Sequence, residues 1–163
     1  MKKLIFSIAI ISAVLISCNE TKNHNSQNVT ADEVHEHEIN EIIPETHSLD
    51  NAWIKDIKLD SGSKWEANAE TTEGVAKMLN LVKSSNQKSV ADYHNLAAKL
   101  NDEKNNVVKK CTMKGPSHDN LHVFLHPLIE KIEALGKVST IEKGAEVTSS
   151  IEENLEGYYN YFQ

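Results

Sequence analysis

The chain has 163 residues, of which 24 are Asp or Glu and 17 are Lys, and its formal net charge is −7. It contains no arginine. An acidic chain without arginine is a poor nucleic-acid binder, because phosphate contacts come mainly from Lys/Arg patches, and it lacks the planar fork that binds carboxylates and phosphates bidentately.

The N-terminus, MKKLIFSIAIISAVLISC, has the layout of a secretory signal peptide. Lys2 and Lys3 precede an apolar run over 4–16, as such signals require, and the run is too short to be taken as a spanning helix. It ends in Leu15-Ile16-Ser17-Cys18. These four residues resemble the lipobox of bacterial lipoproteins, and the resemblance covers about the first twenty residues.

The lipobox resemblance implies a location. Residues 1–17 would be removed and Cys18 lipidated, so that acyl chains anchor the protein in a lipid bilayer at about 0.8 kcal/mol per buried methylene. Asn19 is not the aspartate associated with inner-membrane retention, which favours the outer membrane, with the protein facing the periplasm or the surface. The alternative is an ordinary cleaved signal with a chance cysteine. Lipidation of Cys18 leaves Cys111 as the one free thiol, so no intramolecular disulfide can form.

Residues 18–47 predict a disordered acidic tether. They are polar, contain Pro44, and have too little apolar surface to order themselves. Four of the eight histidines lie here, and His35 and His37 in HEHE could hold a metal ion loosely with the neighbouring carboxylates. The other interpretation of this segment is a solvated spacer.

Residues 48–163 predict an all-α domain, a four-helix up-down-up-down bundle preceded by a short hairpin or extended cap. The cap is the segment from Trp53 to Trp65, with a turn signal at 60–63. Apolar residues at helical spacing predict helices over 72–83, 89–111 and 117–135 and from 139 onward. Ser89/Asp92 and Ser139/Glu142 have capping-box spacing. The expected core positions are Val75, Met78, Leu79 and Val82, then Val90, Tyr93, Ala97, Leu100, Val107 and Val108, then Leu121, Leu125, Leu128, Ile132 and Leu135, and finally Ile141, Ala145, Thr148, Ile151, Leu155, Tyr158 and Phe162.

The stretch CTMKGPSHDNLHVFLHP, residues 111–127, contains one thiol, one thioether and three imidazoles, which are all possible metal ligands. At about 100° per residue, His118 lies on the flank of the apolar face of the third helix, His122 at its boundary and His126 toward water, apart from the other two. His118 and His122, four residues apart, can reach one ion. An antiparallel pair around 112–116 places Cys111 level with His118, with Met113 between them.

More distant residues are expected at the same end of the bundle. In a bundle whose helices alternate in direction, Met78 of the first helix and Tyr158 of the fourth come to the height of these histidines. His94 lies roughly 25 Å away along the second helix.

Sulfur with imidazole favours copper, especially Cu(I), and also suits zinc. The predicted metal ligands are therefore Cys111, Met113, His118 and His122. Two alternatives stay open. These residues could be ordinary core and helix-start side chains, or a haem could lie between Met78 and His122, without covalent attachment because Cys-x-x-Cys-His is absent.

The chain has no nucleophile elbow, phosphate loop or convincing carboxylate pair, so we do not expect an enzyme. The overall layout resembles small uncharacterised envelope lipoproteins, which implies a location and no reaction. The predicted function is a membrane-anchored envelope lipoprotein with a copper or zinc site at one end of its bundle. The alternative is a structural or interaction lipoprotein that docks an envelope protein partner and holds no ion.

Overall fold

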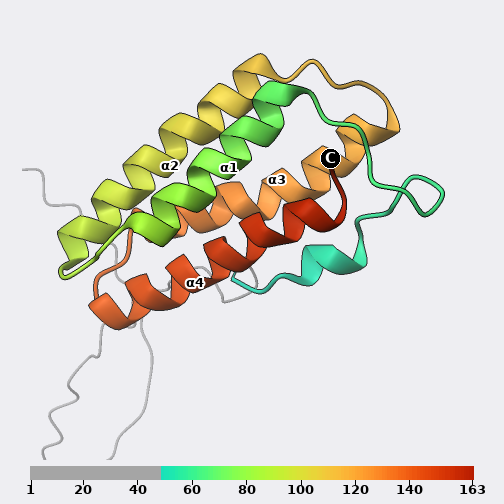
Figure 1. Cartoon of the computed structure of the whole chain (residues 1–163). Helices are drawn as coiled ribbons and strands as arrows, with labels where there is room; N and C mark the ends of the chain where they lie inside the picture. The colour runs from blue at the N-terminus through green and yellow to red at the C-terminus, as the bar shows by residue number, and fades with distance from the viewer. Residues whose placement is uncertain (1–48) are drawn as a thin grey trace, which may run out of the picture. The chain divides into compact units, whose positions relative to one another are not determined.

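The computed structural model describes residues 49–163, and within them the chain forms four α-helices and two short 3-10 helices (Figure 1). In chain order these are η2 (Ala52–Lys55), α1 (Ala69–Ser84), α2 (Val90–Lys110), α3 (Pro116–Leu135), α4 (Ile141–Gly157) and η3 (Tyr158–Asn160). Residues 49–163 hold two isolated β-bridges and no strand, so the predicted all-α class is confirmed for them. The predicted signal peptide (1–17) and the tether with its lipidated Cys18 (18–47) lie outside the described residues.

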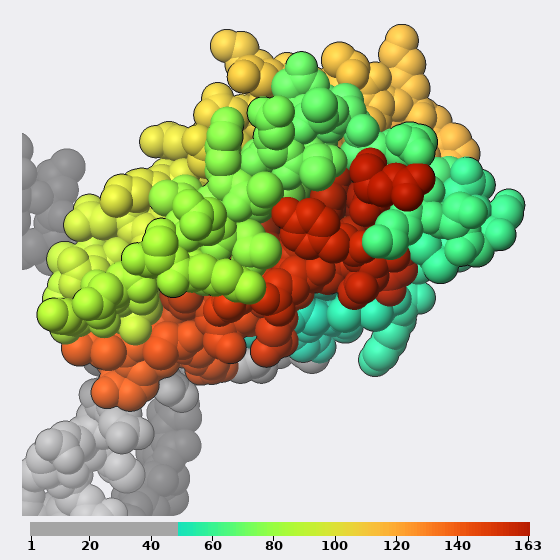
Figure 2. Space-filling model, viewed as in Figure 1, coloured from blue at the N-terminus to red at the C-terminus, as the bar shows by residue number. Residues whose placement is uncertain are grey.

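The four α-helices pack as a bundle around one apolar core. Helix α1 lies against α2 and α4, and α3 packs on the same two helices. Figure 2 shows α1 between α2 and α4 on one face of the molecule. Burial of apolar surface is the main stabilising force in such a core. The residues that are both predicted and buried are Val75, Met78, Val82, Tyr93, Ala97, Leu100, Val107, Leu121, Leu125, Leu128, Ile132, Leu135, Ile151, Leu155, Tyr158 and Phe162.

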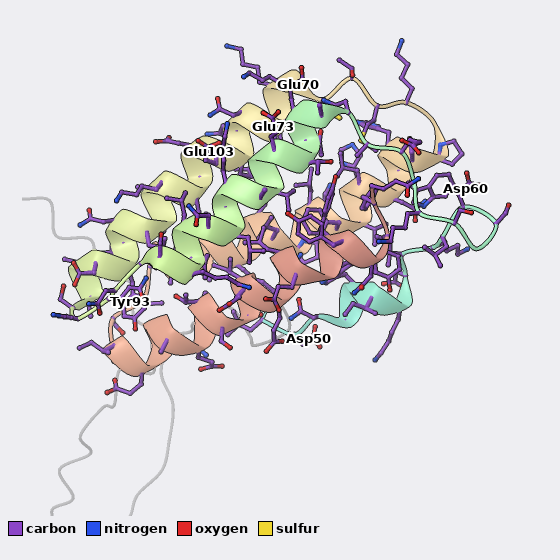
Figure 3. The ribbon with its side chains drawn as sticks, in the orientation of Figure 1. Asp50, Asp60, Glu70, Glu73, Tyr93 and Glu103 are labelled. Atoms are coloured by element: carbon purple, nitrogen blue, oxygen red, sulfur yellow. The ribbon has the colours of Figure 1, made fainter. Side chains whose placement is uncertain are left out.

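The outside of the α1/α2 pair carries charged side chains of both signs. Figure 3 shows Glu70 and Glu73 of α1 and Glu103 of α2 projecting from the outer side of these helices. Glu70 and Glu73 are exposed and Glu103 is half-buried. Carboxylates in these positions stay solvated, which is the ordinary arrangement for the polar side of an amphipathic helix.

Helix α2 begins as the sequence predicts and ends one residue early. Ser89 and Asp92 form the capping box, with Asp92 N donating to Ser89 Oγ at 3.3 Å and Ser89 N donating to Asp92 Oδ2 at 2.9 Å. The helix ends at Lys110, and Cys111 follows in an extended conformation. Val108 is 54% exposed, so its predicted place in the core is wrong. Its neighbour Val107 occupies the inward position, about 100° away around the helix.

Helix α1 begins at Ala69, three residues before the predicted start. Asn68 is the N-cap residue of this helix, but its side chain makes no capping hydrogen bond to the first backbone N–H groups of α1. Its Oδ1 accepts from Thr71 Oγ1 at 2.8 Å, and its Nδ2 donates to Lys110 O at 3.3 Å. The first turn of α1 is thereby joined to the end of α2.

The predicted N-cap of α4, Ser139, is wrong by one residue. Thr140 is the N-cap, and its Oγ1 accepts from Lys143 N at 3.1 Å. The expected box of Ser139 with Glu142 does not form, because the adjacent hydroxyl of Thr140 takes the capping position. The residue three places after Thr140 is Lys143, which has no acceptor with which to complete a box.

The buried face of α4 also differs from the prediction in its first half. Ile141 is 44% exposed and Ala145 is exposed, whereas Gly144 and Val147 are buried. The reason is the close approach of α2 at Gly144, where an added Cβ would lie 2.6 Å from ring atoms of Tyr93. Only glycine lets the ring pack directly on the helix backbone, and this contact turns the 144–147 side inward.

The segment before α1 packs on the side of the bundle. Trp53 of η2 is buried, with its ring 5.6 Å edge-on from Phe124 and 5.8 Å from Tyr161. It also abuts Gly157, where a Cβ would lie 2.8 Å from the indole. These contacts fix η2 against α3 and the end of α4.

The segment from Trp53 to Trp65 includes part of the 3-10 helix η2, followed by a tight turn closed by one antiparallel bridge. Asp60 and Ser63 close a tight turn with two backbone hydrogen bonds of 2.9 Å. Beyond the turn, residues 65–67 run beside the C-terminal residues 161–163. Trp65 N donates to Tyr161 O at 2.8 Å, and Gln163 N donates to Trp65 O at 3.0 Å.

Candidate metal centre

Three histidines lie one turn apart on α3. Helix α3 starts at Pro116, whose missing N–H suits the first helical position, and it then carries His118, His122 and His126. The ring centres of His118 and His122 are 4.5 Å apart with planes at 88°. Those of His122 and His126 are 5.5 Å apart at 81°. His118 and His122 are therefore neighbours, as their four-residue spacing predicts.

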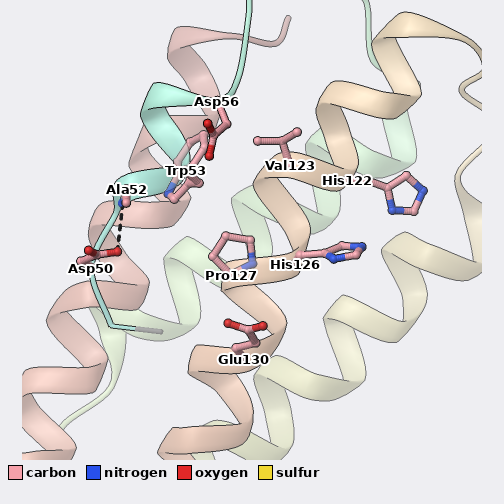
Figure 4. Close-up of a pocket in the computed structure, with 9 residues that line it drawn as sticks. All are labelled: Asp50, Ala52, Trp53, Asp56, His122, Val123, His126, Pro127 and Glu130. Carbon is pink, nitrogen blue, oxygen red and sulfur yellow. Dashed lines mark hydrogen bonds between the residues drawn. The ribbon is translucent and has the colours of Figure 1, made fainter. Parts of the chain in front are cut away.

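The exposure of these rings rises along the helix. His118 is half-buried, while His122 and His126 are exposed. His126 therefore faces water as predicted, and its ring lies 5.5 Å from that of His122, farther than the 4.5 Å between His118 and His122. Figure 4 shows His122 and His126 projecting from the same side of α3.

The ring spacing suits a shared ion. A metal–nitrogen distance of about 2.0–2.1 Å puts each ring centre about 3.2 Å from the ion. At ligand angles of roughly 90–109°, two imidazoles on one ion then have centres about 4.5–5.2 Å apart. The His118–His122 distance of 4.5 Å falls in this range, and the His122–His126 distance of 5.5 Å is slightly longer.

The two sulfur candidates lie in the connection that leads into α3. Cys111 is a free thiol at the end of α2, and Cys111 and Met113 are both partly buried against the core. Thr112 N donates to Asn68 Oδ1 at 3.4 Å, which holds this connection to the start of α1. Gly115 completes it with φ +62°, a conformation that favours glycine.

Tyr158 shares the Cys111 end of the bundle, as predicted. Burial raises the pKa of its phenol to about 12, the hydrogen bond to Thr72 lowers it, and the nearby Tyr159 and Cys111 raise it further. The Tyr158 hydroxyl and Thr72 Oγ1 are 2.9 Å apart. The phenol is therefore neutral at physiological pH and acts as a hydrogen-bonding group.

Two other sequence expectations have clear outcomes. His94 Nε2 is 2.8 Å from Val138 O, at the opposite end of α3, so its exclusion from the site is confirmed. Met78 is fully buried in the core, whereas His122 is exposed on the outside of α3. The structure does not place these two side chains in a common slot for haem.

Within residues 49–163, no group of three or more His, Cys, Asp or Glu is arranged to hold a metal ion. What the structure brings together is a pair of imidazoles, His118 and His122, with His126 next in line. Cys111 and Met113 lie in the connection just before them.

A groove of about 450 Å³ runs between the η2 segment and α3, and the sequence did not reveal it (Figure 4). Its walls come from segments far apart in sequence, which no local pattern could join. Its lining residues are apolar ones together with two histidines and three acidic residues. The lining residues are Asp50, Ala52, Trp53, Asp56, His122, Val123, His126, Pro127 and Glu130.

Lys131 is a second feature that the sequence reasoning missed. Its side chain is fully buried, and Nζ donates to Asn154 Oδ1 at 2.9 Å, to Ser150 O at 3.5 Å and to Asn51 Oδ1 at 2.5 Å. A signal was available, because Lys131 lies three residues after Leu128 and four before Leu135 on the apolar face of α3.

No protein-family model, curated protein or solved structure matches this chain. None of the helices in residues 49–163 is long and apolar enough to cross a membrane.

Proposed function

We propose that this protein is a membrane-anchored envelope lipoprotein that binds copper or zinc where α2 passes into α3. The observation that carries the proposal is the perpendicular pair of imidazoles, His118 and His122, with ring centres 4.5 Å apart. Two histidines on successive turns of one helix are a recurrent way to bind a transition metal. Cys111 and Met113 stand just before this pair and supply sulfur ligands.

The ligand types favour copper in its reduced state. Thiolate and thioether sulfur are soft donors that prefer Cu(I), and imidazole accepts copper and zinc alike. Cys111 is a free thiol that is partly buried. Coordination also protects a lone thiol outside the cytoplasm from oxidation and intermolecular pairing.

The anchor is proposed from the first eighteen residues. Cleavage before Cys18 and its lipidation place the bundle on a membrane surface, with the outer membrane favoured by Asn19. We also infer an up-down-up-down order for the helices. Each helix packs on its neighbours in sequence, and α4 returns to α1, which is the contact pattern that this topology produces.

The test is metal analysis of full-length protein purified in detergent without a polyhistidine tag. All samples carry His35→Ala and His37→Ala, so that the predicted tether cannot bind metal through these two side chains. After loading with Cu(I) under reducing conditions, or with Zn(II), and desalting, about one ion per chain should remain. The Cys111→Ser/His118→Ala double variant should lose Cu(I), because both a thiolate and an imidazole ligand are gone.

His94→Ala is the matched control, because His94 is bonded to Val138 O and lies outside the site. It should keep the full metal content. Metal that stays well below one ion per chain, and does not change in the double variant, would favour the alternative of an interaction lipoprotein that docks an envelope partner.

A further inference from the structure

We propose that the groove between the η2 segment and α3 binds a linear aliphatic diamine or polyamine, with one ammonium group toward each end of the groove and the methylene chain between them. Figure 4 shows the rings of His122 and His126 pointing away from η2. The other lining residues therefore form the binding surface, and the site does not depend on the proposed metal centre.

Carboxylates lie toward both ends of the groove. Asp56 lies at the level of Val123, whereas Asp50 lies across from Pro127, about one turn before Glu130 (Figure 4). Val123 and Glu130 are seven residues apart on α3, so their levels are separated by about 10 Å at about 1.5 Å per residue. Acidic groups at two such levels match two ammonium groups joined by a chain, whereas a single cation can contact one level only.

The surface between the carboxylates is apolar. Ala52, Val123 and Pro127 are half-buried lining residues, and the buried Trp53 also lines the groove. Apolar surface of this kind favours a ligand whose middle is a hydrocarbon chain, because contact removes both surfaces from water. The volume of about 450 Å³ lies in the range of small-molecule sites.

The hydrogen-bonding groups of this surface are mainly acceptors. An ionised carboxylate only accepts hydrogen bonds. Pro127 has no N–H, so α3 supplies no backbone donor to Val123 O, four residues earlier. Both residues line the groove, and an ammonium group there can donate to this carbonyl. A ligand with N–H donors is therefore favoured over one that carries acceptors, such as a phosphate or a carboxylate.

The charge of the groove suits a dication. Ala52 N donates to Asp50 Oδ1 at 3.2 Å, which orients this carboxylate (Figure 4). The buried ammonium of Lys131 interacts with Asp50 and Glu130 and offsets one of the three negative charges. A ligand with two positive charges neutralises the remainder, and the negative groove raises the local concentration of such cations.

The experiment is a nuclear magnetic resonance titration of the full-length chain in a nonionic detergent, with α,ω-diaminooctane as the probe. The indole N–H resonance of Trp53 should shift and saturate, because this ring lines the groove. The indole N–H of Trp65 donates to Lys58 O at 2.6 Å outside the groove, and its resonance should stay unchanged. Diaminopropane is too short to reach both levels, and aminooctanol has one charge. Each should bind about two- to fivefold more weakly, as expected when one exposed ion pair is lost.

Two variants test the two ends of the groove. Asp56→Asn and Glu130→Gln should each weaken binding of diaminooctane about two- to fivefold. Glu133→Gln is the matched control, because Glu133 is exposed on the same helix and does not line the groove. Its Kd should equal that of wild type, and circular dichroism checks that all three variants keep their helices.

Three outcomes would overturn the proposal. Equal binding of the three amines, or a Kd unchanged in both groove variants, would mean a general attraction of cations to an acidic chain. A peptide with two lysines that shifts the Trp53 resonance at lower concentration than diaminooctane would assign the groove to a partner protein. Each of these outcomes would leave the proposed metal centre standing, since its test measures bound metal and involves none of these carboxylates.

Discussion

Among single residues, Lys131 has the most unusual environment, because its side chain is fully buried and lysine is ordinarily exposed to water. Its ammonium has three N–H donors, and the structure provides three acceptors from Asn51, Ser150 and Asn154. One acceptor lies just before η2 and two lie on α4, so a single side chain joins α3 to both. Burial lowers the pKa of Lys131 to about 8, while the charges of Asp50, Glu153 and Glu130 raise it.

The lowered pKa predicts a specific dependence of stability on pH. The ordinary lysine pKa is 10.5, so between about pH 8 and 10.5 the unfolded chain holds a proton that the folded chain has released. The free energy of unfolding of wild type, relative to Lys131→Met, should therefore rise across this window, in total on the order of 3 kcal/mol. Below pH 8 the difference should be constant. Urea denaturation at a series of pH values measures it, because other titrating groups cancel between the two proteins. A difference that stays constant from pH 8 to 10.5 and falls only above pH 10.5 would show that the neighbouring carboxylates outweigh burial.

At the scale of elements, close approaches at glycine fix how the helices meet. Gly74 of α1 faces Val107 of α2, and Gly144 of α4 faces the ring of Tyr93. In each case a Cβ would overlap a buried side chain of the partner helix. Glycine in a helix interior costs about 1 kcal/mol relative to alanine, so these positions give up local helix preference for a shorter distance between helices.

Gly144 should respond to alanine in the direction opposite to that expected from helix propensity. Gly144→Ala should destabilise the bundle by about 1–3 kcal/mol, because the new methyl lies 2.6 Å from Tyr93 ring atoms and forces the ring to move. Propensity alone predicts a gain of about 1 kcal/mol. The matched control is Gly136→Ala, where the nearest atom is 3.4 Å away, and its effect should stay within about 0.5 kcal/mol. Denaturant unfolding compares the two, and a stabilised Gly144→Ala would mean that the ring does not pack on the backbone.

The start of α4 offers a second test at this scale, because two adjacent hydroxyl residues compete for the cap. Thr140 Oγ1 accepts from Lys143 N, so Thr140→Ala should cost about 1 kcal/mol of stability. Ser139 makes no capping bond and is exposed, so Ser139→Ala should be nearly neutral. If thermal or urea unfolding showed Ser139→Ala to be more destabilising than Thr140→Ala, the capping box of Ser139 with Glu142 that the sequence predicts would be present instead.

For the molecule as a whole, the sequence predicts the features that depend on the periodic spacing of apolar residues. The helices were found because apolar spacing and the Ser89/Asp92 box are local signals, and α3 and α2 were placed to within one residue. The inward face of early α4 was missed, because it depends on a Gly144–Tyr93 contact between helices. The groove between the η2 segment and α3 also depends on long-range packing, because the packing of Trp53 brings its two walls together.

One part of the candidate metal centre can likewise be predicted from the sequence, and another part cannot. The His118–His122 pair follows from four-residue spacing on one helix and could be predicted. The helix wheel places His126 toward water, and its ring is exposed there while still lying 5.5 Å from the ring of His122. An angle of 40° per four residues separates two Cβ atoms only modestly, and the side chains lean toward each other along the axis. Whether Cys111 and Met113 join the histidines depends on the path of the 111–115 connection, which spacing does not determine.

The lipidation proposed at Cys18 would attach the whole protein to a membrane. If Cys18 is lipidated, the mature chain begins there and loses Lys2 and Lys3, so its formal charge goes from 17 − 24 = −7 to 15 − 24 = −9. Mass spectrometry should find an N-terminal peptide starting at Cys18 with acyl groups attached. One acyl chain gives only marginal membrane binding, whereas two or three hold a protein stably, so the wild type should partition into the detergent phase and resist extraction by high salt. Cys18→Ala should carry no acyl mass. A wild-type N-terminal peptide with an unmodified Cys18, or an uncleaved residue 1–17 segment, would contradict the lipid anchor while leaving the metal centre on α3 to be judged by its own experiments.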